Sequence, residues 1–415
     1  MKKTTKDRVS VSLLALFYII SFAGIAWISL ARHNIFRDTI ENFSDYRTAV
    51  ILIIFVVLSF VYYIYINNKK QVGNHKIYLF LIAIATICFV TPTFLSADIY
   101  AYLLAAKNVF LHQLNPYQKP LAEMTSDPWL KQIGDIWWLK IPTLYGPLAT
   151  LISAVPLLFT KSLLTSIYLY KFFALLAFSA TFYLISSRLP IEQEKRKLIA
   201  LMFALNPSIL IYLVLEGHND IFVILFFVAS YIAYLNKKTS LSFFSLMGSA
   251  LVKYSTLAIL PVFWFRDKKF LIKQAVMSTL IVAISVLLFI LVFQIFDSPL
   301  YTRELSRMST GCLYLCNPYH QLVYSLPQNY GIYLNYLIVF LLYLYTSYRY
   351  LFKSFNYLKF SFWISFIVIF ILTSWNAPWY PTLLITIGIL INEKKYHYLV
   401  YILTIYSLIH IYLPF

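Results

Sequence analysis

The stretch from residue 77 to residue 102 reads IYLFLIAIATICFVTPTFLSADIYAY and changes character close to its end. Residues 77 to 95 contain no charged side chain, and roughly 17 to 25 such residues are enough to cross a hydrocarbon core about 30 Å thick. Asp98 follows this run almost at once. An ionisable group at the edge of a membrane is costly and is a functional candidate by default. The stretch therefore predicts a membrane-spanning helix followed by a functional carboxylate at the edge of the membrane.

The same apolar pattern recurs along the whole chain. Of the 415 residues, 61% are hydrophobic and only 12% are charged, which is more apolar surface than a water-soluble core can bury. We predict an all-α polytopic membrane protein, one integral membrane domain over residues 1–415, with about 12 or 13 spans by the length rule. The clearest runs are 11 to 31, 48 to 66, 77 to 95, 270 to 296, 331 to 352 and 398 to 413.

The net charge of +18 comes mostly from short loops between the apolar runs. The positive-inside rule explains it without nucleic acid as a partner and places the N-terminus in the cytoplasm. We expect the cell membrane as the location and membrane lipids as neighbours. Two longer loops, 96–142 and 297–330, then lie on the outer face. Cys312 and Cys316 share the second loop, and we expect free thiols there rather than a bridge.

The loop connections predict three local structures. Residues 98–112 have apolar positions at helical spacing with Lys107 and Asn108 on another face, which is typical of a helix along the membrane surface. Residues 239–265 have basic residues at both ends and predict a short helical hairpin with Lys253 at its outer tip. Residues 143–187 predict a half-spanning segment over 145–159 and then one full span. Irregular backbone at membrane depth indicates a cavity, here one that opens outward.

Four groups of residues are candidates for chemistry. Asp98 is either a catalytic carboxylate or only the cap of the following helix. The run Glu216-Gly217-His218-Asn219-Asp220 is either a site that holds an acceptor, a base or a cation, or a capped helix start. Lys253 either binds phosphate or extends to the membrane surface. Arg303 and Arg307 lie one turn apart, where they either grip an anion together or form a solvated face with Glu304.

Several familiar motifs are missing from the chain. It contains no Gly-rich nucleotide fingerprint, no Walker lysine motif, no His-Glu-x-x-His and no Asp-x-Asp pair. We therefore expect no cofactor, and nothing in the sequence indicates a divalent metal. A sugar donor would have to be activated without the usual metal and nucleotide clamp.

The motifs in their order resemble the GT-C superfamily of membrane glycosyltransferases, in particular its polyprenyl-phosphate-mannose-dependent α-mannosyltransferases. The matching stretches are SADIYAY (96–102), Asn115-Pro116-Tyr117, Asp127-Pro128-Trp129, Tyr145-Gly146-Pro147-Leu148, Gly217-His218-Asn219-Asp220 and Lys253. The resemblance implies a GT-C bundle whose first large outer loop carries surface helices and the catalytic aspartate, which matches Asp98 by position. It also implies a lipid-phosphate sugar donor and a lipid or glycan acceptor.

The chemistry that follows is an inverting transfer with Asp98 as general base. Lys253, with an arginine of the second loop, would stabilise the leaving phosphate. The substrate-binding candidates are Tyr100, Tyr102, Asn115, Tyr117, Tyr145, Glu216, His218, Asn219, Asp220, Lys253, Arg303 and Arg307. Two other functions stay open: a transporter or lipid flippase, which also places polar residues at broken helices, and a polymerase or ligase with lipid-diphosphate substrates.

Overall fold

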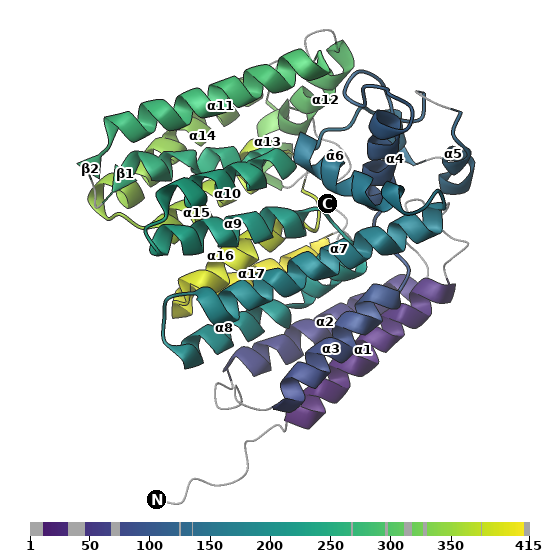
Figure 1. Ribbon diagram of the computed structural model, residues 1–415. Helices are drawn as coiled ribbons and strands as arrows, with labels where there is room; N and C mark the ends of the chain where they lie inside the picture. Colours follow the sequence, from purple (N-terminus) through teal and green to yellow (C-terminus); the bar gives the residue numbers. More distant parts are fainter. Residues whose placement is uncertain are drawn as a thin grey trace, which may run out of the picture.

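The computed structural model describes residues 11–31, 46–67, 75–123, 126–134, 136–266, 269–294, 298–310, 318–326, 330–374 and 376–410. These residues form a helical bundle with a single two-stranded hairpin, β1 (Phe265–Arg266) and β2 (Lys269–Phe270), in which Phe265 pairs with Phe270 (Figure 1). The α-helices are α1 (Val11–Ala31), α2 (Tyr46–Asn67), α3 (His75–Val90), α4 (Asp98–Phe110), α5 (Pro128–Ile133), α6 (Pro147–Ala154), α7 (Leu163–Tyr183), α8 (Gln193–Ala204), α9 (Asp220–Leu235), α10 (Thr239–Val252), α11 (Ile272–Phe293), α12 (Pro299–Thr310), α13 (Pro318–Tyr324), α14 (Tyr330–Ser347), α15 (Tyr357–Phe366), α16 (Pro381–Ile391) and α17 (Lys394–Ile409).

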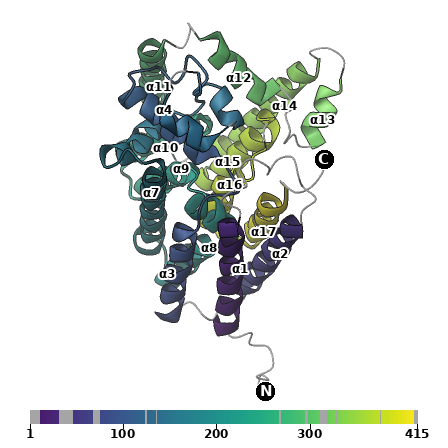
Figure 2. The same cartoon turned by 90° about the vertical axis from the view of Figure 1, so that its right-hand side faces the viewer.

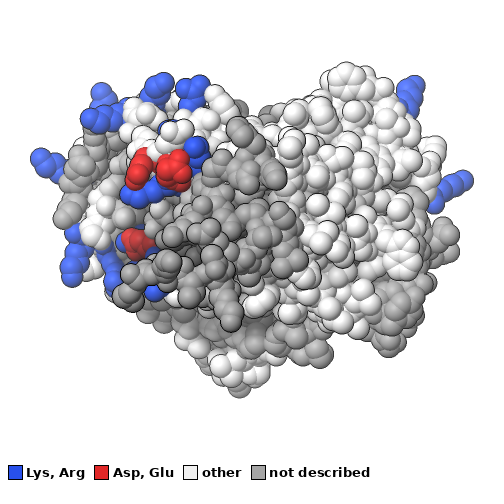
Figure 3. All heavy atoms as spheres, turned by 90° about the horizontal axis from the view of Figure 1, so that it is seen from below, with Lys and Arg blue, Asp and Glu red and all other residues white. Residues whose placement is uncertain are grey.

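The predicted all-α polytopic membrane protein is confirmed. Among the described residues, three continuous helices are long and apolar enough to cross a membrane: Leu163–Arg188, Ile272–Phe293 and Tyr330–Lys353. Nine shorter apolar helices have 10–17 residues, so the predicted number of spans stays a prediction. Seen from below, most of the visible Lys and Arg gather at one end of the molecule, a few lie at the opposite edge, and the described surface next to that edge is uncharged (Figure 3).

One further span is bent. Helix α8 and the π-helical segment η6 (Ile209–Leu215) form a pair that passes the same test, with an angle of 67° between them. Pro207 lies at the break, where its ring and its missing N–H interrupt the helical hydrogen bonds. The neighbouring Asn206 fixes the bend, because its Nδ2 donates to Thr404 Oγ1 at 2.8 Å. The bend directs η6 toward the turn at residues 216–220.

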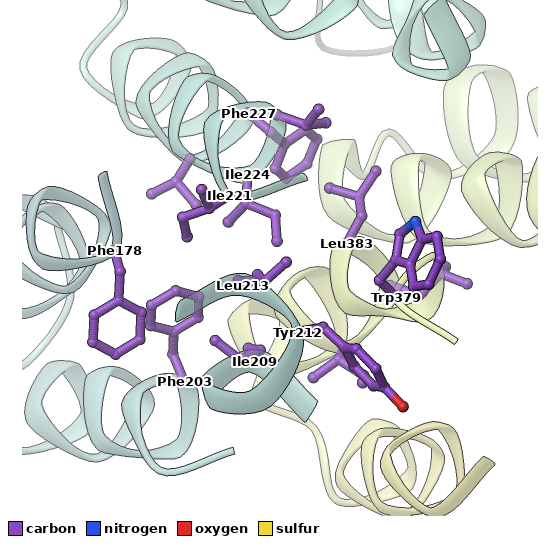
Figure 4. Close-up of a cluster of buried hydrophobic side chains, with 14 of the residues drawn as sticks. Phe178, Phe203, Ile209, Tyr212, Leu213, Ile221, Ile224, Phe227, Trp379 and Leu383 are labelled. Atoms are coloured by element: carbon purple, nitrogen blue, oxygen red, sulfur yellow. The ribbon is translucent and has the colours of Figure 1, made fainter. Parts of the chain in front are cut away.

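The core lies where helices from distant parts of the chain meet. Phe178 of α7 stacks on Phe203 of α8 with ring centroids 5.4 Å apart. Trp379 and Leu383, from the C-terminal third, lie in the same cluster as Tyr212 (Figure 4). Helices α1, α2 and α3 lie together on one side of the molecule (Figures 1 and 2), and α6 lies next to α12, with α4 and α5 farther out (Figure 1).

The hairpin predicted over 239–265 is confirmed. Helix α10 ends at Val252, Lys253 is extended, and the 3-10 helix η7 (Tyr254–Trp264) leads back. The rings of Phe243 and Phe263 are 5.6 Å apart, so the two arms lie side by side with Lys253 at the tip. Before α7, α6 has only 8 residues, while the helix Leu163–Arg188 has 26. These lengths agree with a half-spanning segment followed by a full span, and the depth of the first segment stays a prediction.

The helix predicted over 98–112 is observed as α4, but its polar face differs from the expectation. Lys107 and Asn108 are buried rather than placed on a separate polar face. Lys107 Nζ lies 2.6 Å from Asp127 Oδ2 and 3.9 Å from the centre of the Trp129 ring. The rest of the 96–142 loop therefore folds over α4, and the buried charge of Lys107 is paired, as burial requires.

The two long loops lie at the same end of the molecule. Ser298 Oγ, just before α12, donates to the carbonyl of Tyr117 at 2.7 Å. Tyr117 also packs against Tyr301 of α12, with ring centroids 5.7 Å apart. The placement of both loops on one face follows the prediction, while Cys312 and Cys316 lie outside the described residues.

Gly146, directly before α6, packs closely against the backbone of the hairpin. Its N–H donates to the carbonyl of Val252 at 3.0 Å, and an added Cβ would lie 2.1 Å from the carbonyl oxygen of Leu251. We expect Gly146→Ala to lower stability by about 1–3 kcal/mol, as overpacking does. A thermal melt in detergent measures the loss. Gly24→Ala is the control, since its Cβ would meet only the flexible Ile54 Cδ1, at 3.3 Å; equal melting temperatures for the two variants would contradict the prediction.

Candidate active site

Asp98 is the first residue of α4 and its carboxylate is buried, with 1% of the residue exposed. Oδ2 accepts hydrogen bonds from the hydroxyls of Tyr102 at 3.1 Å and Tyr145 at 2.9 Å. His218 Nδ1 lies 3.5 Å from the same oxygen. Oδ1 accepts from Ser96 Oγ at 3.1 Å. Asp98 is therefore held by groups from three separate parts of the chain rather than acting as a plain helix cap.

These contacts decide the charge of Asp98. Burial on its own raises the pKa of a carboxyl group, but the hydrogen bonds and charge of His218, together with those from Tyr145 and Tyr102, hold the pKa of Asp98 below its usual value. The carboxylate is therefore ionised at neutral pH. An ionised carboxylate at the end of a loop is the form that a general base requires.

His218 connects Asp98 to the C-terminal third of the protein. Its ring stacks on Trp379 with centroids 3.9 Å apart and an interplanar angle of 20°. The preceding Gly217 has φ 68°, a left-handed conformation that only glycine adopts readily, and this lets the turn present His218. Trp379 was not among the residues singled out from the sequence.

Asp220 and Lys253 form an ion pair beside this group. Lys253 Nζ lies 2.9 Å and 3.2 Å from the two carboxylate oxygens of Asp220. The same nitrogen lies 4.0 Å from the ring centre of Tyr380, the residue after Trp379. Lys253 is still partly exposed, with 18% of its side chain accessible against 5% for Asp220. One turn, residues 216–220, thus places His218 near Asp98 and Asp220 near a lysine.

Glu216 and the buried Lys171 hold the segment that leads into Asp98. Glu216 Oε1 accepts the backbone N–H groups of Phe94 and Leu95 at 3.1 Å each, and Oε2 accepts that of Ser96 at 3.2 Å. Lys171 Nζ donates to the carbonyls of Cys88, at 3.1 Å, and Thr91. We call Glu216 and Lys171 the charge clamp. Glu216 binds the amides of residues 94–96, and Lys171 binds two carbonyls of residues 88–91. The charge clamp therefore fixes the position of Asp98 at the start of α4.

The other sequence candidates lie away from Asp98. The side chain of Tyr100 forms a hydrogen bond with Thr93, which precedes α4, and not with Asp98. Asn115 and Tyr117 join the first outer loop to its neighbours: Asn115 Nδ2 donates to the carbonyl of Phe293, and the Tyr117 hydroxyl donates to the carbonyl of Tyr145 at 3.1 Å. Their substrate-binding roles stay predictions.

The two arginines are on α12. Arg303 is largely exposed and pairs with Glu304 at 3.1 Å, but Glu304 is buried, so only Arg303 fits a solvated face. The side chain of Arg307 lies outside the described part of the structure. Within the described ranges, no three His, Cys, Asp or Glu side chains gather as metal ligands do.

Comparison with known proteins gives one match. A family model described as "alpha-(1→6)-mannopyranosyltransferase, N-terminal domain" matches residues 8–266. The match includes Asp98, the charge clamp, the 216–220 turn and Lys253, and it ends before Trp379 and Tyr380. No curated protein and no solved structure matches the chain.

Proposed function

Since this chain belongs to the α-(1→6)-mannopyranosyltransferase family, we propose that it transfers mannose from a polyprenyl-phosphate-linked donor to a lipid or glycan acceptor on the outer face of the membrane. The family membership confirms the resemblance to GT-C mannosyltransferases found in the sequence. The lipid-phosphate donor, the outer face of the membrane and the inverting mechanism are what we propose beyond the family. They rest on the residues around Asp98.

The observation that carries the proposal is that one turn, residues 216–220, contacts both the buried carboxylate of Asp98 and the partly exposed Lys253. Asp98 contacts His218, which stacks on Trp379, and Lys253 lies over the adjacent Tyr380. A base for the acceptor hydroxyl and a cation for a phosphate are therefore held by the same two turns. This pair suits a phosphate leaving group and needs no nucleotide clamp.

The reaction follows from these positions. The acceptor hydroxyl gives its proton to the Asp98 carboxylate while its oxygen forms a bond to the anomeric carbon of the donor. The bond from that carbon to the phosphate oxygen breaks, and the electron pair leaves with the phosphate. The Lys253 ammonium stabilises the charge that develops on the phosphate. Tyr145 is only half-buried, so we infer that the acceptor hydroxyl reaches Asp98 Oδ2 by replacing the Tyr145 hydroxyl.

A donor comparison tests the function. The purified protein is given a lipid or mannan acceptor with radiolabelled mannose, carried either on polyprenyl phosphate or on guanosine diphosphate. Incorporation from the lipid donor alone is the expected result. Incorporation from the nucleotide sugar with no polyprenyl phosphate present would overturn the proposed donor class, and incorporation from neither would remove the basis for the proposal.

Lys253 gives a separate prediction. We expect Lys253→Met to raise the KM for the lipid donor by about 10-fold or more, because a charge-assisted hydrogen bond to phosphate contributes about 1.5–3 kcal/mol. Initial rates across a donor series measure this. Arg303→Met is the control, since Arg303 is exposed and paired with Glu304. An unchanged donor KM in Lys253→Met would show that Lys253 only holds Asp220.

A further inference from the structure

The turn before α16 lies against the turn that carries His218. Besides the stack of Trp379 on His218, Tyr212 contacts Trp379 with ring centroids 6.3 Å apart. The hydroxyl of Tyr212 in turn donates to the carbonyl of Ser407, and Ser407 Oγ donates to that of Pro378 at 2.5 Å. The C-terminal third, which the family model does not match, thus forms one wall of the candidate active site.

Unpaired polar atoms gather on these two turns. Six buried side-chain atoms there have no hydrogen-bond partner among the described residues: His218 Nε2, Asn219 Nδ2 and Oδ1, Asn376 Nδ2 and Oδ1, and Trp379 Nε1. Asn219 is 0% exposed and Asn376 is 1% exposed. Folded proteins pair the great majority of such groups. One of these carboxamides is adjacent in sequence to His218, and the other lies three residues before Trp379, which stacks on His218. Two fully unpaired carboxamides on these turns therefore indicate a polar ligand.

The types of these atoms define the ligand. A phosphate offers only hydrogen-bond acceptors, and a cation binds only atoms with lone pairs. Either ligand would therefore leave the Oδ1 or the Nδ2 of each asparagine unpaired. A sugar hydroxyl donates and accepts at once, and so matches an asparagine side chain in both directions. Trp379 Nε1 adds a donor, and His218 Nε2 adds a second donor when the ring carries the charge that faces Asp98.

We propose that Asn219, Asn376, His218 and Trp379 form a sugar-binding subsite that recognises mannose hydroxyl groups next to Asp98. The proposal rests on the proposed function, and it adds residues of the C-terminal third to the site. His218 then has two tasks: its Nδ1 faces Asp98 and its Nε2 faces the sugar. The sugar is either the mannosyl group of the donor or the terminal sugar of the acceptor.

Asn376→Leu tests the subsite. Leucine has a similar size and no polar atoms, so it removes the unpaired amide without opening a large cavity. We expect the melting temperature to stay the same or rise, since replacing an unpaired buried polar group by an apolar one is neutral or stabilising. Saturation-transfer NMR on the full-length protein in detergent measures the binding of α-1,6-mannobiose. This binding should weaken by about 10-fold, as expected for lost hydrogen bonds to a neutral sugar.

Transfer kinetics then identify the source of the sugar. A higher KM for the lipid donor assigns the subsite to the donor mannosyl group, and a higher KM for the acceptor assigns it to the acceptor. Asn335→Leu on α14 is the matched control, because Asn335 is also buried with an unpaired Nδ2 but lies outside the two turns.

Unchanged mannobiose binding in Asn376→Leu would overturn the subsite, and a lower melting temperature in that case would show that Asn376 binds only internal water. The binding measurement does not depend on catalysis. A failure of the wild-type protein to use the lipid donor would therefore contradict the proposed function, while mannobiose binding would still decide the subsite.

Discussion

Asp98→Asn is expected to lower the turnover number for mannose transfer by about 10²- to 10⁴-fold, the usual contribution of a general base. Asparagine has nearly the same shape and still accepts a hydrogen bond from Tyr102 or Tyr145 through its remaining oxygen. It cannot take a proton from the acceptor hydroxyl. The KM values should change little, because the substrate contacts stay in place. Steady-state rates on detergent-purified protein measure the effect.

Asp127→Asn is the matched control for Asp98. Asp127 is also a buried carboxylate of the first outer loop, but it pairs with Lys107 and caps α5 through the N–H of Trp129 at 2.9 Å. We expect this variant to lose thermal stability and to keep most of its turnover number. A turnover number that falls equally in both variants would mean that Asp98 acts only through the fold.

Glu216→Gln is expected to lower the turnover number by about 100-fold, the cost of a displacement near 1 Å in a reacting group. Glutamine keeps the size of Glu216 but replaces one carboxylate oxygen with a donor. That donor would face a backbone N–H of residues 94–96, where a donor is already present. The charge clamp would then be left with the cation Lys171 alone, and the segment before Asp98 would shift.

The ratio of turnover number to KM separates positioning from binding in this variant. If Glu216 acts through Asp98, the turnover number falls while the KM for each substrate stays within about 3-fold, since the lost interaction concerns only the transition state. A higher acceptor KM at an unchanged turnover number would instead make Glu216 a substrate-binding residue. Glu304→Gln is the control, a buried glutamate of α12 that pairs with Arg303.

The sequence was sufficient for the elements that follow local rules. The change in character near Ser96 predicts the start of α4 at Asp98, whereas α3 ends at Val90, before the end of the predicted 77–95 run. Basic residues on both sides of 239–265 predict the hairpin, because they place both ends on the same side of the membrane. A segment of this length can return to the same side only as a short hairpin. The tip at Lys253 follows from the same parity argument.

Contacts between distant segments were not predictable in the same way. Glu216 was a candidate because it is charged in an apolar region, but its partners lie about 120 residues earlier, which no local pattern reveals. Lys171 lies in the middle of a predicted span. A lysine inside a membrane span is a functional candidate for the same reason as Asp98. Lys107 was assigned to a polar face because helical spacing does not show what folds over a helix.

Trp379 and Tyr380 were missed for a different reason. The chain contains 35 Tyr and 8 Trp, so an aromatic pair carries little information by itself. The signal that was present is Asn376-Ala377-Pro378, a polar break between two apolar runs, similar to the break at 216–220. Two such breaks at the same end of a bundle are candidates for one site.

The stereochemistry of transfer tests the central claim most directly. The wild-type protein is given a synthetic polyprenyl phosphate with β-linked ¹³C-labelled mannose and a mannoside acceptor, and the anomeric configuration of the new bond is determined by NMR. The account, in which Asp98 activates the acceptor for a single displacement, predicts an α-linked product at the rate of donor consumption. A β-linked product, or a covalent mannosyl-enzyme trapped on Asp98, would contradict it.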